Sequence, residues 1–197
     1  MRIGKYNPFK GQNLLNDIGT STDRSFVAHF VLEDTEAVVG SNTAIKTAVT
    51  LADALTTTLT TADINQPTAA RVLNITGNAA TAIGDVVITG TDIADNVITE
   101  TIVSTGAATV SGTKAFKTIT TIVLPERGAP GDTIAIGTTN AFGLPYKLAF
   151  DTIIKVLNNG TATTVASGNY DATDISENFI TPTAAPVGNQ IDVYLLV

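Results

Sequence analysis

The chain has 197 residues, a formal net charge of −7, 44% hydrophobic residues and only 15% charged residues. A negative chain repels a phosphate backbone, so this composition argues against nucleic acid as a partner. The absence of cysteine excludes disulfides, thiolate nucleophiles and zinc–thiolate sites. No stretch approaches the roughly 20 apolar residues that cross a bilayer, and the start of the chain lacks a signal-peptide pattern. We therefore expect a protein made in the cytoplasm, with no membrane partner.

Residues 1–40 are expected to form an extended N-terminal arm and a first strand. Turn-forming Asn, Gly and Pro residues recur through the arm, which fits either an ordinary disordered terminus or an arm that orders against a neighbouring subunit. Four apolar side chains favour the second interpretation and are the predicted partner contacts: Tyr6, Phe9, Leu14 and Leu15. Residues 25–32 predict a strand that is apolar, and therefore buried, on both faces. Within it, His29 is expected to be a satisfied core histidine and not a general base or metal ligand.

Residues 41–140 are expected to form the main β domain. Residues 45–61 fit either a short helix or, because of their threonine density, a strand. From residue 71 onward, apolar and threonine-rich runs separated by Gly and Asn turn signals predict an antiparallel meander. The predicted strands are 71–77, 84–90, 96–104, 115–124 and 132–137. The predicted inner face consists of Leu73, Ile75, Val86, Ile88, Ile98, Ile102, Phe116, Ile122 and Leu124.

Residues 141–197 are expected to add a β hairpin and a closing strand packed on the main domain. The sequence Asn158-Asn159-Gly160 predicts a type I′ turn, because Asn and Gly tolerate positive φ angles. The apolar run at 190–197 predicts a strand deep in a sheet, or one that adds to the sheet of another subunit. The fold class that follows is all-β, an antiparallel β-sandwich or barrel with an extended N-terminal arm.

The sequence offers little that is typical of an active site. It contains no nucleophile elbow and no phosphate-binding loop, so we expect no enzymatic activity and no cofactor. Asp92, Asp95 and Asn96 form the best acidic cluster and could offer oxygen ligands to calcium. Their spacing differs from that of an EF-hand loop, which favours ordinary solvated turn carboxylates. Asp171 and Asp174 have the same explanation.

Several short segments of the sequence carry a resemblance to a known family. The sequence Ile-Thr-Gly ends two predicted strands, at Ile75-Thr76-Gly77 and Ile88-Thr89-Gly90. The other segments are residues 114–120, Leu124-Pro125, residues 142–147 and residues 191–194. Together these segments, within residues 65–197, resemble the β domain of small structural proteins of tailed bacteriophages. The resemblance implies a virion component on the capsid surface. It would be a decoration or cement protein that binds the major capsid protein, reinforces capsomer contacts and assembles as a homotrimer.

Two alternatives remain open at this point. The first is another structural position in the virion, such as a head fibre base, a tail tube or a baseplate. The second is a calcium-dependent or carbohydrate-binding adhesion module, in which Asp92, Asp95 and Asn96 would form the site.

Overall fold

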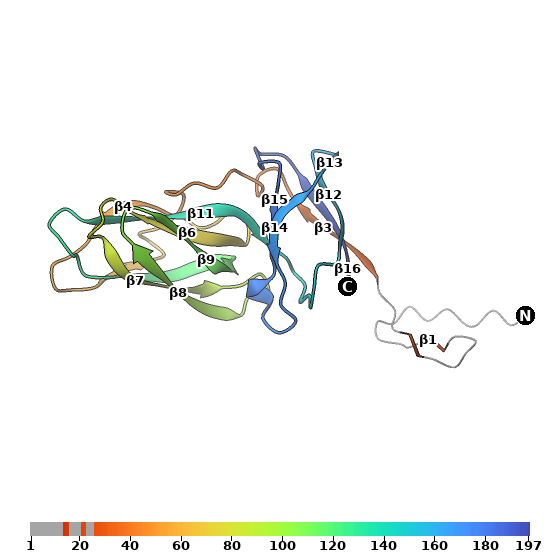
Figure 1. The fold of residues 1–197 in the computed structure, drawn as a ribbon, viewed down its shortest axis with the longest axis horizontal. Coiled ribbons are helices and arrows are strands. Elements are labelled where there is room, and N and C mark those ends of the chain that lie inside the picture. The colour runs from red at the N-terminus through yellow and green to blue at the C-terminus, as the bar shows by residue number, and fades with distance from the viewer. Residues whose placement is uncertain (1–13, 16–20, 23–25) are drawn as a thin grey trace, which may run out of the picture.

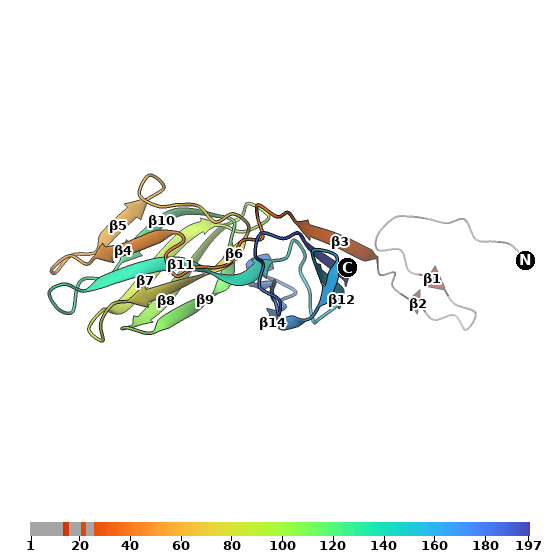
Figure 2. The ribbon, with the colours of Figure 1, turned by 90° about the horizontal axis from the view of Figure 1, so that it is seen from above.

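The strands of this protein are antiparallel throughout the part of the chain that the structure describes. The structure is a computed structural model, and it describes residues 14–15, 21–22 and 26–197. Its strands gather in two lobes placed end to end along the long axis (Figures 1 and 2). Before them, β1 (Leu14–Leu15) pairs with β2 (Ser21–Thr22). The predicted all-β class is confirmed, and the only other regular element in the described residues is the short 3₁₀ turn η1 (Ile175–Glu177).

The first lobe, here called the sandwich lobe, consists of two facing sheets. One sheet has the order β5-β10-β7-β8, with β5 (Thr57–Thr60), β7 (Ile83–Thr91), β8 (Val97–Thr105) and β10 (Thr118–Leu124). The other is built from β4 (Lys46–Thr50), β6 (Arg71–Gly77), β9 (Thr109–Phe116) and β11 (Thr133–Gly143). Every residue of the predicted inner face is buried between them. Alternation therefore predicted this core correctly.

The outward-facing side of the β7–β8 sheet explains the threonine content. Along β8, residues alternate strictly between exposed and buried, and every exposed position is Thr or Val. Thr89 pairs with Thr99 across the strands, and the hydroxyls of Thr91 and Thr118 lie 2.7 Å apart. Threonine suits this position because its branched side chain packs on a pleated surface while its hydroxyl stays hydrogen-bonded.

The second lobe, here called the C-terminal lobe, holds the other core. Its sheet has the order β13-β12-β16-β3, formed by β3 (Val27–Leu32), β12 (Ile153–Asn158), β13 (Thr161–Thr163) and β16 (Ile191–Leu196). It packs against β14 (Val165–Asn169), β15 (Phe179–Pro182) and the far end of β11. Buried residues shared by these layers include Phe142, Val156, Ile180, Val193 and Leu195.

Two local predictions in the C-terminal lobe are confirmed. Asn159 and Gly160 have φ angles of 49° and 74°, as a type I′ turn between β12 and β13 requires. The closing strand β16 lies between β12 and β3 in the middle of its sheet.

The strand alternative holds for residues 45–61, which contain the two strands β4 and β5. Two other predictions need correction. The predicted strand 115–124 is broken at residue 117, where β9 ends and β10 begins. Burial of the first strand on both faces is wrong, because β3 is an edge strand covered on one face, and Val27 is 63% exposed.

The expected segment boundaries at residues 40 and 140 can be compared with the course of the strands. β3 lies before the first boundary, yet it pairs with β16 at the other end of the chain. β11 crosses the second boundary, pairing with β6 in the sandwich lobe and with β15 in the C-terminal lobe. The two cores therefore share one continuous strand.

Candidate functional site

The four predicted arm contacts fall largely outside what the structure describes. Tyr6 and Phe9 lie outside the described residues. For Leu14 and Leu15 the structure gives the backbone pairing of β1 with β2. Their role as partner contacts stays a prediction.

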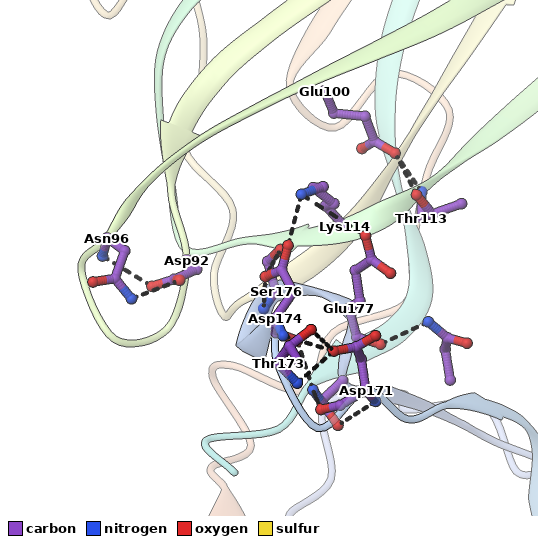
Figure 3. Close-up of polar contacts among 12 residues, drawn as sticks. Asp92, Asn96, Glu100, Thr113, Lys114, Asp171, Thr173, Asp174, Ser176 and Glu177 are labelled. Atoms are coloured by element: carbon purple, nitrogen blue, oxygen red, sulfur yellow. Dashed lines mark hydrogen bonds and ion pairs between the residues drawn. The ribbon is translucent and has the colours of Figure 1, made fainter. Parts of the chain in front are cut away.

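Asp92, Asp95 and Asn96 lie together in the turn between β7 and β8, and Figure 3 shows Asp92 and Asn96 there. Asp92 is only 2% exposed. Its Oδ1 accepts from the backbone N–H groups of Ala94 (2.8 Å) and Asn96 (3.0 Å), and its Oδ2 accepts from Asn96 Nδ2 (2.9 Å). This is an Asx-type turn, in which a carboxylate replaces backbone acceptors. Asp92 is therefore a buried turn-forming group, and the expectation of a solvated carboxylate is wrong for it.

The neighbouring Asp95 has a different environment from Asp92. Its φ angle is +64°, a left-handed conformation that Asp and Asn adopt more readily than most residues. Its carboxylate points to solvent and accepts from Lys117 Nζ at 2.7 Å. No group of three His, Asp or Glu side chains suited to a metal ion occurs within the described residues.

A second polar cluster fills the loop that carries η1 (Figure 3). The Asp171 carboxylate accepts from the hydroxyl and backbone N–H of Thr173 (both 2.6 Å) and from the backbone N–H of Asp174 (2.7 Å). These bonds, led by the Thr173 hydroxyl, lower the pKa of Asp171 to about 2. Asp174 in turn caps η1 by accepting from Ser176 N–H at 2.9 Å. Each carboxylate thus holds the backbone of its own loop.

Lys114 joins this loop to the sandwich lobe. Its Nζ, at the end of β9, donates to Asp174 Oδ2 at 2.8 Å and lies 3.8 Å from Glu177 Oε1. The hydrogen bond to Asp174 raises the pKa of Lys114. Burial alone raises the pKa of Asp174, but the bonds from Lys114 and Ser176 outweigh it and hold that pKa below its usual value. The ion pairs of Lys114 with Asp174 and Glu177 thus connect the sandwich lobe to the loop that carries η1.

Asn178 is a structural residue that the sequence did not reveal. Its side chain is fully buried. Its amide oxygen accepts two hydrogen bonds and its amide nitrogen donates two. Oδ1 accepts from the backbone N–H groups of Leu148 and Asp171, while Nδ2 donates to the carbonyls of Asp171 and Asp174. Only the folded loop brings these partners together.

Glu100 is the most unusual carboxyl group among the described residues. It lies on the inner face of β8 with 9% exposure, and its Oε1 accepts from the backbone N–H and hydroxyl of Thr113. Its Oε2 has no hydrogen-bond partner, and burial raises its pKa. Gly112 lies directly against this carboxylate, where a Cβ atom would clash with it. The Glu100 carboxylate therefore links β8 to β9 through its two hydrogen bonds from Thr113.

The C-terminal lobe also exposes an apolar surface, here called the outer sheet face. It is the side of the β12-β16-β3 sheet that faces away from the core, and Val27, Ile154 and Leu196 on it are 63%, 56% and 39% exposed. Its residues are Val27, His29, Val31, Ile154, Lys155, Leu157, Asp192, Tyr194 and Leu196, so one lysine and one aspartate lie among mainly apolar side chains. A shallow hollow of about 390 Å³ lies on it, lined mainly by apolar side chains.

His29 lies on this outer sheet face, so its assignment to the core is wrong. Its side chain is 44% exposed and stacks on Tyr194, with ring centroids 4.4 Å apart and planes at 2°. Its Nε2 lies 2.8 Å from Asp192 Oδ1. The histidine is satisfied, as predicted, but by a cross-strand pair on the surface. The residues of β3 and β16 that form this surface were visible in the sequence, but the pairing of the two strands was not.

Comparison with known proteins gives no match, whether to family models, to curated proteins or to solved structures. Among the described residues, no helix is long and apolar enough to cross a membrane. The resemblance of residues 65–197 to phage structural proteins stays a prediction.

Proposed function

We propose that this protein is a non-enzymatic structural component of a virion. In this proposal it is a decoration or cement protein that binds the outside of a tailed-phage capsid and stabilises contacts between capsomers. Its partners are the major capsid protein and further copies of itself in a homotrimer. The sequence segments within residues 65–197 supply the link to phage proteins.

The outer sheet face is the observation that carries a role in assembly. Exposed apolar surfaces of this kind mark interaction sites, because leaving them in water is unfavourable. Here the surface lies on a four-stranded sheet whose other side is a packed core. Such a surface is held rigid before a partner arrives, which reduces the entropy lost on binding.

The use of the polar groups also supports a structural role. Asp92, Asp171 and Asp174 hold turns and caps, and Lys114 ties the lobes together. The large threonine-rich face of the sandwich lobe is nearly free of charge. Chemical groups that an enzyme would direct into a cleft are here used to fix the backbone.

The mechanism we propose is additive burial of surface over many sites. Burial of apolar area contributes about 25 cal/mol per Å², and a typical stable interface buries about 800 Å² on each partner. A copy that contacts two capsid subunits at once gains further from its high effective concentration at the second contact. In this mechanism the predicted arm contacts Tyr6, Phe9, Leu14 and Leu15 contribute to the apolar area that each copy buries on binding.

Two measurements test the proposal. Light scattering gives the mass of the purified protein, and quantitative mass spectrometry gives its copy number in the particles with which it co-purifies. A trimer in solution with many copies per particle is expected, since capsid sites repeat with the symmetry of the shell. A few copies per particle would move the protein to a tail, baseplate or fibre, and absence from particles would overturn the virion role.

The arm has its own test. A variant without residues 1–20 is expected to keep the circular dichroism of a β protein while losing its binding to particles in co-sedimentation. Full occupancy by the truncated protein would remove the arm from the mechanism.

A further inference from the structure

The outer sheet face borders an open sheet edge. Phe26 and Val197 exchange both of their backbone hydrogen bonds, each 2.9 Å long. In an antiparallel pair such bonded positions alternate, so Val27, His29 and Val31 direct their N–H and C=O groups away from β16. No strand among the described residues pairs with this side of β3, so a row of backbone donors and acceptors runs beside the apolar surface.

This edge carries few of the features that normally prevent strand addition. Edge strands are commonly protected by lysine, proline or a bulge, yet β3 reads Val-Ala-His-Phe-Val-Leu and pairs with β16 in unbroken register. Near Val31 the edge borders a hollow of about 380 Å³, whose opposite wall is formed by residues 66–70. The place suits an extended segment that adds backbone bonds and lays apolar side chains on the sheet.

Residues 1–25 have the composition that such a site requires. They immediately precede β3 and contain Ile3, Tyr6, Phe9, Leu14 and Leu15 as apolar groups. Fully extended, ten residues span about 33 Å, which exceeds the length of β3. The segment is therefore long enough to follow the whole edge.

The charge distribution of residues 1–25 favours one orientation of this segment along β3. Residues 1–25 hold four of the 11 basic residues of the chain but only two of its 18 acidic residues, so they are positive in a chain of net charge −7. Three of the basic residues, Arg2, Lys5 and Lys10, fall within the first ten positions. Glu33 and Asp34 follow β3 directly and line a polar hollow at that end of the sheet. Opposite charges at this point favour one orientation of the segment over the reverse.

We propose that residues 1–15 of one copy bind the outer sheet face and the open β3 edge of a neighbouring copy, with their basic side chains toward Glu33 and Asp34. The donor is taken to be a neighbouring copy, because exchange between copies links them into the homotrimer of the proposed function, and the experiment below distinguishes this from binding within one chain. Exchange of this segment from each copy to the next closes a ring, as a cyclic homotrimer requires. The link to a trimer rests on the proposed function, whereas the binding site itself does not.

The chain contains no cysteine, so any disulfide that forms must join the introduced cysteines. Full-length Phe9→Cys and Val27→Cys single variants would be mixed and oxidised without particles. The control mixture pairs Phe9→Cys with Val103→Cys, because Val103 is 53% exposed, against 63% for Val27, but lies on the sandwich lobe. A disulfide requires Cα atoms within about 7 Å.

The expected product is a disulfide between positions 9 and 27 of different chains, at least tenfold more abundant than the control product. Peptide mass spectrometry identifies it. An equal yield in both mixtures would overturn the proposal, and so would a Phe9→Cys/Val27→Cys double variant that cross-links only within one chain. As a second measurement, light scattering should show a reduced mass for Ile154→Asp and an unchanged mass for Val103→Asp. Since no capsid is present, these results are independent of whether the protein decorates one.

Discussion

Replacing Asp92 with alanine tests whether its carboxylate folds the β7–β8 turn. The change removes the acceptor for the backbone N–H groups of Ala94 and Asn96 and for the Asn96 side chain. A hydrogen bond to a charged group contributes about 1.5–3 kcal/mol. Ala94 and Asn96 are exposed, so water can partly replace the lost acceptor. We therefore expect the free energy of unfolding to fall by about 2 kcal/mol, less than the roughly 3–6 kcal/mol that two such backbone bonds would contribute without water to replace them.

Urea unfolding followed by circular dichroism measures this loss. Asp92→Asn is the matched control, because it keeps an oxygen in the position of Oδ1 and should lose about half as much stability. A loss below about 0.5 kcal/mol for Asp92→Ala, the range of an ordinary surface substitution, would refute the structural role of the carboxylate.

The same preparations distinguish the turn from a calcium site. A ligand that binds the folded state raises its thermal midpoint. We expect millimolar calcium to leave the midpoint of the wild-type protein unchanged. A rise that disappears in Asp92→Ala would instead support the adhesion-module alternative.

Three further outcomes are expected from buried or constrained side chains. Burial raises the pKa of Glu100 in the folded state, so its charged form destabilises the fold at neutral pH. The advantage of Glu100→Gln in urea unfolding should therefore shrink as pH falls from 7 to 4. The pKa of Asp171 is lowered to about 2, so the stability it provides is present above its ordinary pKa and is lost as pH falls toward 2; Asp171→Asn should show a smaller loss in acid unfolding. Arg71 is 1% exposed and lies 4.3 Å from the Phe142 ring centroid; Arg71→Met should stay within about 1 kcal/mol of wild type in urea, whereas Arg71→Ala should lose about 3 kcal/mol.

The sequence predicted best where local chemistry alone decides the structure. The Asn158–Gly160 turn needs positive φ angles, which its residues supply. The inner faces of β7 and β8 follow from alternation because both strands lie in a sandwich with one side in water. Neither inference depends on a distant partner.

Features that depend on distant pairing could not be predicted. His29 and Asp192 are 163 positions apart, and Lys114 and Asp174 are 60 apart. Whether a strand such as β3 is buried on one face or on two depends on which strands and layers reach it, and its own residues do not encode that.

The strand that both cores share has a mechanical consequence. β11 pairs with β6 from Ile134 to Phe142 and with β15 at Phe142 and Gly143, so a pull on the C-terminal lobe passes along a covalent backbone into the sandwich lobe. Neither lobe is a module that could be cut out at residue 140 and moved to another protein, because the cut would sever this strand. A protein built this way transmits strain between its two ends without a hinge.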